Sequence, residues 1–138
     1  MKAQQYKAQA GITVIPGTRV AITVPVTYNG TDPQCTAKVT CYVYVGQLLS
    51  GHGKLIETIV GVDQVYAPGE TKNLQFFHTT TLESDARRDV GFAIDYWDKN
   101  TGATKSGPIS SGSERDDVFY VQPVTYSFAI DQPVVAQA

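Results

Sequence analysis

Strict alternation of apolar and polar residues over 35–45, "CTAKVTCYVYV", predicts a β-strand with one buried face. Its apolar face consists of Val39, Cys41, Val43 and Val45, and its opposite face of Lys38, Thr40, Tyr42 and Tyr44. The face that should meet water therefore carries two tyrosines, and their role is the first question that this sequence raises.

The same period of two recurs along the chain, and no segment shows the period of an amphipathic helix. Strands are predicted over 11–15, 18–28, 35–46, 54–66, 71–80, 89–98 and 117–130. The side chains expected to face the core include Val20, Ile22, Val24, Val26 and Tyr28, then Ile56, Val60, Val62 and Tyr66, then Leu74, Phe76 and His78, and finally Val90, Phe92, Ile94 and Tyr96. Pro123 interrupts the last segment, which favours an edge strand or a bulge there.

Turn residues separate these strands. Pro16-Gly17 and Pro68-Gly69 both predict turns, and the order Pro-Gly in the second suits a type II turn. Residues 29–34 have the composition of a loop. Residues 99–116 lack any periodicity and are rich in Gly, Ser, Thr and Pro, which predicts a flexible loop.

A chain of 138 residues has the length of one domain that can bury its own core. Many short strands joined by turns predict an all-β fold, a two-sheet antiparallel β-sandwich of about seven strands, with a small barrel as the alternative. We expect the sandwich to span residues 12–130. An N-terminal arm or edge strand at 1–11 would precede it, and a C-terminal tail at 131–138 would follow.

Composition and charge narrow the possible partners. Hydrophobic residues make up 42% of the chain, charged residues 17%, and the formal net charge is −2. That charge provides no broad attraction to nucleic acid or to anionic lipid, so neither is an expected partner. The first residues lack the apolar core of a secretory signal, and we expect synthesis in the cytoplasm without export. The sequon at 29–31 is accordingly interpreted as a turn.

The two cysteines are predicted to stay unpaired. Six residues of extended strand separate Cys35 from Cys41 by about 20 Å, whereas a disulfide needs Cα atoms within about 7 Å. Cys41 is expected to be a small buried hydrophobe between valines, and Cys35 a free thiol in a loop.

No catalytic, cofactor-binding or metal-binding residue is predicted. The stretch "GHGK" at 51–54 lacks the spacing of a phosphate-binding loop, and no helix is predicted after it. His52 has no visible partner, and His78 is expected to be a satisfied, semi-buried histidine. Acidic residues at 95, 98, 114, 116 and 117 lack the spacing of a calcium loop, and we interpret them as solvated charge.

Four stretches carry a resemblance to a known family, at residues 20–46, 65–77, 90–102 and 116–121. With its polar turn after the second strand, its Pro-Gly-Glu turn before the fifth and its acidic turn after the sixth, the chain resembles an immunoglobulin-like sandwich of adhesion-related and fibronectin-type repeats. It lacks the paired cysteines and central tryptophan of antibody-type domains. The resemblance covers roughly residues 12–122 and implies a binding or assembly module, although a fold by itself assigns no function.

An immunoglobulin-like domain without an export signal resembles the capsid decoration proteins and small head or tail components of bacteriophages and other viruses. We therefore expect a non-enzymatic structural protein of the virion. Its partners would be other virion proteins and copies of itself. The alternative is a ligand-binding sandwich module for carbohydrate or adhesion.

The interface candidates are Tyr42, Tyr44 and Trp97, all predicted to point away from the core. On neighbouring strands of one sheet they would form a single outward patch. Tyrosine and tryptophan are enriched at binding hot spots, so the patch predicts an interface. The alternative is that these aromatics pair across strands and stabilise the sheet, by about 0.2–1 kcal/mol per pair.

Overall fold

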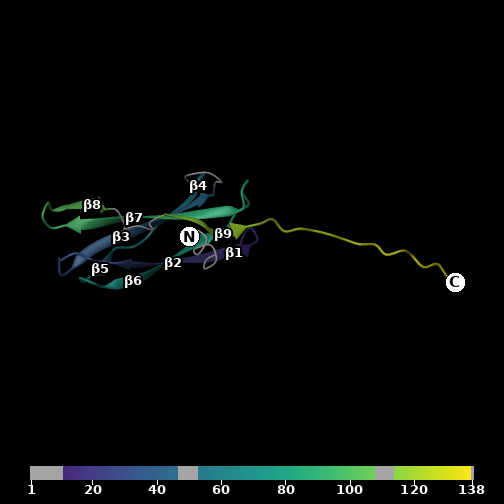
Figure 1. Ribbon diagram of the computed structural model, residues 1–138, viewed down its shortest axis with the longest axis horizontal. Helices are drawn as coiled ribbons and strands as arrows, with labels where there is room; N and C mark the ends of the chain where they lie inside the picture. The colour runs from purple at the N-terminus through teal and green to yellow at the C-terminus, as the bar shows by residue number, and fades with distance from the viewer. Residues whose placement is uncertain (1–10, 47–52, 108–113, 138) are drawn as a thin grey trace.

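The computed structural model describes residues 11–46, 53–107 and 114–137, with the backbone alone at 114–117. Nine strands and no helix occur in this part of the chain (Figure 1). The strands are β1 (Ile12–Val14), β2 (Arg19–Thr27), β3 (Cys35–Val45), β4 (Leu55–Val60), β5 (Gln64–Tyr66), β6 (Thr71–Thr79), β7 (Arg87–Asp98), β8 (Ala103–Gly107) and β9 (Glu114–Val121).

The strands form two sheets of unequal size. The larger sheet has seven strands in the order β1-β9-β7-β3-β4, with β5 also beside β3 and β8 also beside β7. The smaller sheet contains only β2 and β6. Every described pair is antiparallel except β1 with β9, which is parallel. The predicted all-β, two-sheet sandwich is confirmed.

The core lies between the sheets, at the alternating positions that the sequence predicts. On β3, the valines at 39, 43 and 45 and Cys41 are buried, because this face of the larger sheet packs against the smaller sheet. From the smaller sheet, Val20, Ile22, Val26, Phe76 and His78 are buried against it. The predicted inward faces of β2, β3, β6 and β7 are therefore confirmed.

Both predicted Pro-Gly turns are present. Gly17 and Gly69 have φ of 89° and 81°, the left-handed region that a type II turn requires of its third residue. In the second turn the Glu70 amide donates a hydrogen bond to the Ala67 carbonyl at 3.0 Å.

The single strand predicted over 54–66 is wrong, because β4 ends at Val60 and β5 begins at Gln64, with Gly61 directly after the end of β4. The Gly61 amide donates to the Val39 carbonyl at 3.0 Å, and a Cβ at position 61 would lie 2.4 Å from that oxygen. Only glycine permits this close approach.

Val60 and Val62, expected in the core, are exposed. For Val60 the cause lies earlier in β4, because its pairing with β3 shifts at a bulge between Val43 and Tyr44, and Glu57 and Ile59 take the inward positions instead. Val62 lies between β4 and β5.

The flexible loop predicted over 99–116 is wrong at 103–107, where β8 pairs with β7 as a hairpin. Most β8 side chains are exposed, so the strand shows no apolar alternation for sequence analysis to detect. Backbone pairing to β7 is sufficient to form it. Residues 114–116 belong to β9, and residues 108–113 lie outside the described residues.

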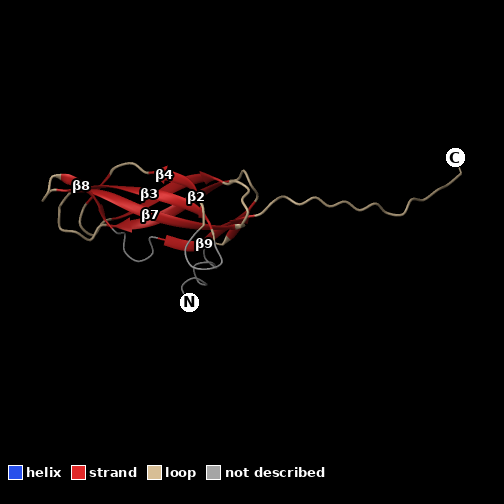
Figure 2. Cartoon of the chain, turned by 90° about the horizontal axis from the view of Figure 1, so that it is seen from above, coloured by secondary structure: helices blue, strands red, loops and turns tan. Residues whose placement is uncertain are grey.

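The last strand ends at Val121, not at residue 130 as predicted. The Gln122 amide still donates to the Val14 carbonyl at 2.9 Å, but Pro123 has no amide hydrogen to continue the ladder. Residues 122–137 then leave the sandwich as an extended segment, in both views of the molecule (Figures 1 and 2). From here on, the C-terminal tail means residues 122–137, a longer segment than the tail predicted at 131–138.

Candidate functional site

Tyr42 and Tyr44 lie together on the outer face of the larger sheet. Their ring centroids are 6.4 Å apart, and the rings are tilted by 31°. Tyr42 stands opposite Gly91 of β7, a buried residue without a side chain, so space for the ring exists beside the β7 backbone. Both tyrosines are half-buried. They pack on the sheet and on each other, and they still present aromatic surface to solvent.

Trp97 points to the same face but does not join the tyrosines. Tyr42 is opposite Gly91, and six further residues along β7, about 20 Å at ~3.3 Å per residue, separate Gly91 from Trp97. Trp97 is instead opposite Thr104 of β8 and 46% exposed. The structure therefore brings two of the three interface candidates together and separates the third from them.

Replacing Tyr42 and Tyr44 together with Ser should lower the free energy of unfolding by about 1–2 kcal/mol, because the contact between the rings and their partial burial on the sheet are lost. Chemical denaturation measures this change. An unchanged stability would show that the pair contributes nothing to the fold. The matched control is Thr58→Ser, the exposed neighbour of Tyr42 on β4, which should change stability by less than about 0.5 kcal/mol.

An end cleft lies beside Trp97, where the loop after β2 meets the end of β7. Its volume is about 450 Å³, and it is lined by residues 30–33 and 96–100, with Tyr28 and Cys35. The Lys99 ammonium lies 2.9 Å from Asp32 Oδ1 and links the two loops. This hydrogen bond and a second one from the Gln34 amide lower the pKa of Asp32. The end cleft thus combines aromatic rings with charged and amide groups.

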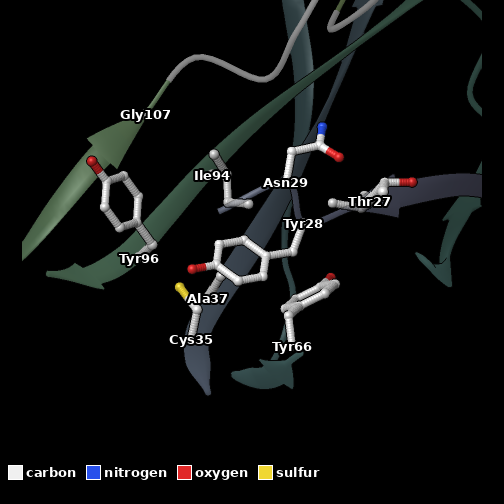
Figure 3. Close-up of a pocket in the computed structure, with 10 residues that line it drawn as sticks. Thr27, Tyr28, Asn29, Cys35, Ala37, Tyr66, Ile94, Tyr96 and Gly107 are labelled. Atoms are coloured by element: carbon white, nitrogen blue, oxygen red, sulfur yellow. The ribbon is translucent and has the colours of Figure 1, made fainter. Parts of the chain in front are cut away.

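A second cavity, here called the β2 groove, opens between the two sheets near the end of β2. Its volume is about 290 Å³, and its lining includes Tyr28, Tyr66, Ile94, Tyr96 and Gly107. Figure 3 shows the three tyrosine rings around it, with Cys35 beside Tyr28. The Tyr66 hydroxyl is buried and has no hydrogen-bond partner among the described residues.

The alternation of the strands predicts inward faces for the tyrosines of the β2 groove, and so predicts that they belong to the core. Tyr28, Tyr66 and Tyr96 come from three strand ends that meet only in the folded chain. Large inward aromatics at strand ends were the available signal, since such positions lie at the rim of a sandwich.

The cysteine thiols are poorly suited to nucleophilic chemistry. Both cysteines are free, as their spacing predicts, and both are buried. Burial, with a smaller effect of Glu57, raises the pKa of the Cys41 thiol to about 12. Burial also raises the pKa of Cys35, and the negative charge of Asp32 adds a smaller effect in the same direction. The prediction that Cys35 lies in a loop is wrong, because Cys35 is the first residue of β3.

His78 lies on the inner face, as predicted, but it is fully buried and not semi-buried. Its Nδ1 is hydrogen-bonded to Glu57 Oε1 of β4, whereas its Nε2 has no hydrogen-bond partner among the described residues, so the predicted satisfied histidine is only half satisfied. The alternation does not predict this partner, because it assigns Glu57 of β4 to the outward face of the strand. The contact links the smaller sheet to the larger one. His52 lies outside the described residues, as do the side chains at 114–117. Elsewhere, no group of three or more His, Cys, Asp or Glu could hold a metal ion.

Asp85 and Arg87 form a bidentate ion pair at the start of β7. The Arg87 Nε donates to Asp85 Oδ1 at 3.0 Å, and the Arg87 amide donates to the same oxygen at 2.9 Å. The side-chain bond and then the backbone bond lower the pKa of Asp85 to about 2, from 3.8.

This depressed pKa predicts a loss of stability in acid. Above pH 3.8 the full contribution of Asp85 is present, and it disappears as the pH falls through about 2. We expect about 1 kcal/mol, less than the whole shift implies, because the carboxylate is partly exposed. Denaturation of Asp85→Asn should show this loss already at pH 7 and little further change from this site between pH 4 and 2. An unaltered pH profile would contradict the prediction.

The C-terminal tail carries the most exposed of the large apolar side chains in the described part of the chain. Tyr126 is 81% exposed, Phe128 91% and Ile130 95%. A soluble monomer rarely leaves such side chains in water along one continuous segment, and a segment of this kind marks an interaction site or an aggregation hazard.

Two further observations complete the description. Among the described residues, no helix is long and apolar enough to cross a membrane. Comparison of the chain with models of protein families, with curated proteins and with solved structures found no match.

Proposed function

We propose that this protein is a non-enzymatic assembly protein that acts through contacts with other protein chains. The observation that supports this function most directly is the C-terminal tail with its exposed apolar side chains. Burying such surface against a partner contributes roughly 25 cal/mol per Å² of apolar area. The half-buried pair Tyr42 and Tyr44 offers a second surface of the kind enriched at interfaces.

The finer form of the proposal is an immunoglobulin-like structural protein of a virus particle, either a capsid decoration protein or another small head or tail component. Its partners would then be other virion proteins and copies of itself. The family resemblance over residues 12–122 supports this form of the proposal. Such a sandwich would have two sheets, as this chain has. Rigid sandwiches with an extended tail suit assembly, because the tail can reach a neighbour while the sandwich keeps its shape.

Velocity sedimentation of lysates from cells that naturally produce the protein tests this function. The chain should travel with assemblies much larger than its own 15.0 kDa. The double variant Phe128→Asp with Ile130→Asp should shift to the monomer fraction, whereas Thr125→Asp with Ser127→Asp, on the other side of the tail, should not. A native chain that sediments only as a monomer would contradict the proposal.

The end cleft favours one alternative, a ligand-binding module for carbohydrate. An exposed indole can stack on the apolar face of a sugar ring, while carboxylate and amide groups nearby accept and donate hydrogen bonds to its hydroxyls. Glycan-array binding that is lost in Trp97→Ala, and kept in Tyr42→Ser, would favour this alternative over assembly. Absence of binding to any glycan would exclude it.

A further inference from the structure

We propose that the C-terminal tail of one copy adds as an antiparallel strand to the free edge of β2 in a second copy, with its apolar side chains covering the β2 groove. This inference rests on the proposed assembly function and specifies both the partner and the contact.

The tail has the pattern of a strand without a sheet. Apolar side chains alternate with small or polar ones at Val124, Tyr126, Phe128 and Ile130. After the bond from the Gln122 amide, no backbone hydrogen bond joins the described tail to the sandwich. Aromatic and β-branched residues at a period of two favour an extended strand that buries one face. Water can satisfy the backbone of the tail while it is exposed, but burial of its side chains on an apolar surface also requires a sheet edge for its backbone groups.

β2 provides such an edge. The Tyr28 amide donates to the Glu70 carbonyl, and the Thr80 amide donates to the Thr18 carbonyl, so even-numbered residues of β2 bond to β6. Because the bonding direction alternates along an antiparallel strand, the odd-numbered residues direct their backbone groups away from β6. Among the described residues no strand pairs with that side of β2. Pro25 stands at one of these odd positions, where its missing amide hydrogen costs no bond to β6. An added strand would therefore bond to the amides of the odd-numbered residues on either side of Pro25.

The β2 groove lies beneath this free edge. Its walls come from the end of β2 and from β3, β5, β7 and β8, and none comes from β6. A strand added beside β2 would direct every second side chain toward Ile94 and Tyr96 on β7, which are only partly buried. The groove is mostly apolar, so it suits the aromatic and aliphatic side chains of the tail.

The edge of β6 is a poorer acceptor, because the larger sheet closes that side. β6 is linked there to β4 through His78 and Glu57, and the Lys72 ammonium lies 5.5 Å from the centre of the Tyr66 ring on β5. No cavity described above is lined by β6. A strand added beside β6 would find backbone partners but no groove for its side chains.

Chain direction makes a second copy the natural acceptor. β1 runs parallel to β9, and the turn at 15–18 reverses the chain into β2, so β2 runs opposite to β9. The tail continues from β9 away from the sandwich, at the end opposite to β5 and β8 (Figure 1). A copy placed ahead in the same orientation would receive the tail antiparallel to its β2. A tail folded back on its own chain would run parallel to β2, the slightly less stable pairing.

Such a contact joins different surfaces of the two copies, so it is a head-to-tail contact that yields a ring or a filament. Sixteen extended residues reach about 50 Å, more than the nine residues of β2 require.

Sedimentation equilibrium of the purified full chain tests the inference. The average mass should rise above 15.0 kDa with concentration. Phe128→Asp with Ile130→Asp should weaken this self-association at least about tenfold, whereas Thr125→Asp with Ser127→Asp should leave it unchanged.

A second pair of variants identifies the acceptor edge. Thr23 and Gln75 are register partners on β2 and β6, and both are odd-numbered positions with amides directed away from the partner strand. With Pro25 already lacking an amide hydrogen, Thr23→Pro would leave no backbone donor on the free edge between Ala21 and Thr27, so it should weaken self-association at least about tenfold, whereas Gln75→Pro, which removes the equivalent amide on β6, should preserve it. If Thr23→Pro fails to fold, a fluorescent peptide of residues 122–137 provides the same test. It should bind the Phe128→Asp, Ile130→Asp chain, and unlabelled wild-type chain should compete with it.

Three results would overturn the inference: a wild-type chain that stays at 15.0 kDa at every concentration, peptide that does not bind, or loss of association in Gln75→Pro but not in Thr23→Pro. A purified chain that stays monomeric, yet sediments with large assemblies in native lysates, would overturn the strand addition and leave the proposed function standing. Self-association of the purified chain with only monomer in native lysates would contradict the proposed function alone.

Discussion

Phe76→Ala should lower the free energy of unfolding by about 3–5 kcal/mol, the range for removing a buried phenylalanine from a core. Phe76 is buried on β6 and its ring centroid lies 6.0 Å from that of Phe92 on β7, so the pair joins the two sheets. β2 and β6 have no backbone pairing to the larger sheet among the described residues. Side-chain packing of this kind therefore holds the smaller sheet in place, and chemical denaturation should show the loss.

Phe77→Ala is the matched control. Phe77 is the next residue on the same strand, but it points outward and is 42% exposed beneath the Arg19 guanidinium, which lies 3.9 Å from its ring centre. Loss of this exposed cation–π contact should cost less than about 1 kcal/mol. Equal losses for the two variants would contradict the assignment of Phe76 to the interface between the sheets.

Arg88→Ala should lower the free energy of unfolding by about 3 kcal/mol or more. Arg88 is 0% exposed. Its guanidinium donates to the Thr81 carbonyl at 2.9 Å, to the Arg87 carbonyl at 3.0 Å and to the Asp85 carbonyl. These bonds attach the segment before β7 to the strand. Without the guanidinium, three carbonyl groups lose a donor and a cavity remains.

The neighbouring Arg87→Ala provides the control for Arg88. Arg87 is partly exposed, and its guanidinium pairs with Asp85. Ion pairs near the surface contribute little to stability, typically about 1 kcal/mol or less. Removal of the Arg87 side chain should cost about 1 kcal/mol, and thermal melts of the two variants at pH 7 compare them directly. A loss for Arg88→Ala no larger than that for Arg87→Ala would show that the buried bonds contribute little.

Periodicity predicted which residues face the core wherever a strand runs without interruption. The pairs β2–β6 and β3–β7 each keep one register over nine residues, and the inward residues of these four strands are those that the alternation indicates. In β4 the same pattern gives the wrong face for Val60, because the pairing with β3 shifts at a bulge between Val43 and Tyr44, and the strand then ends at Gly61, which closely approaches the Val39 backbone. A period of two says nothing about where a neighbouring backbone will approach.

The partners of a strand are the second feature that periodicity leaves undetermined. β8 forms without any apolar alternation, because β7 offers it an edge. The tail has strong alternation and forms no strand in this chain, because no edge of its own sandwich lies along its path. The pattern shows what a segment can bury, whereas the fold decides whether a surface is present for it.

The candidate surfaces divide in the same way. Tyr42 and Tyr44 are two residues apart on one strand, so the sequence alone determined that they share a face, and the structure places their rings together. The position of Trp97 relative to them depends on the register between β3 and β7, which separates it by about 20 Å. Likewise, the β2 groove and the end cleft arise where ends of distant strands meet. Local alternation determined the faces of the strands, and only the tertiary structure decided which faces meet, because pairing and register depend on contacts between residues far apart in the chain.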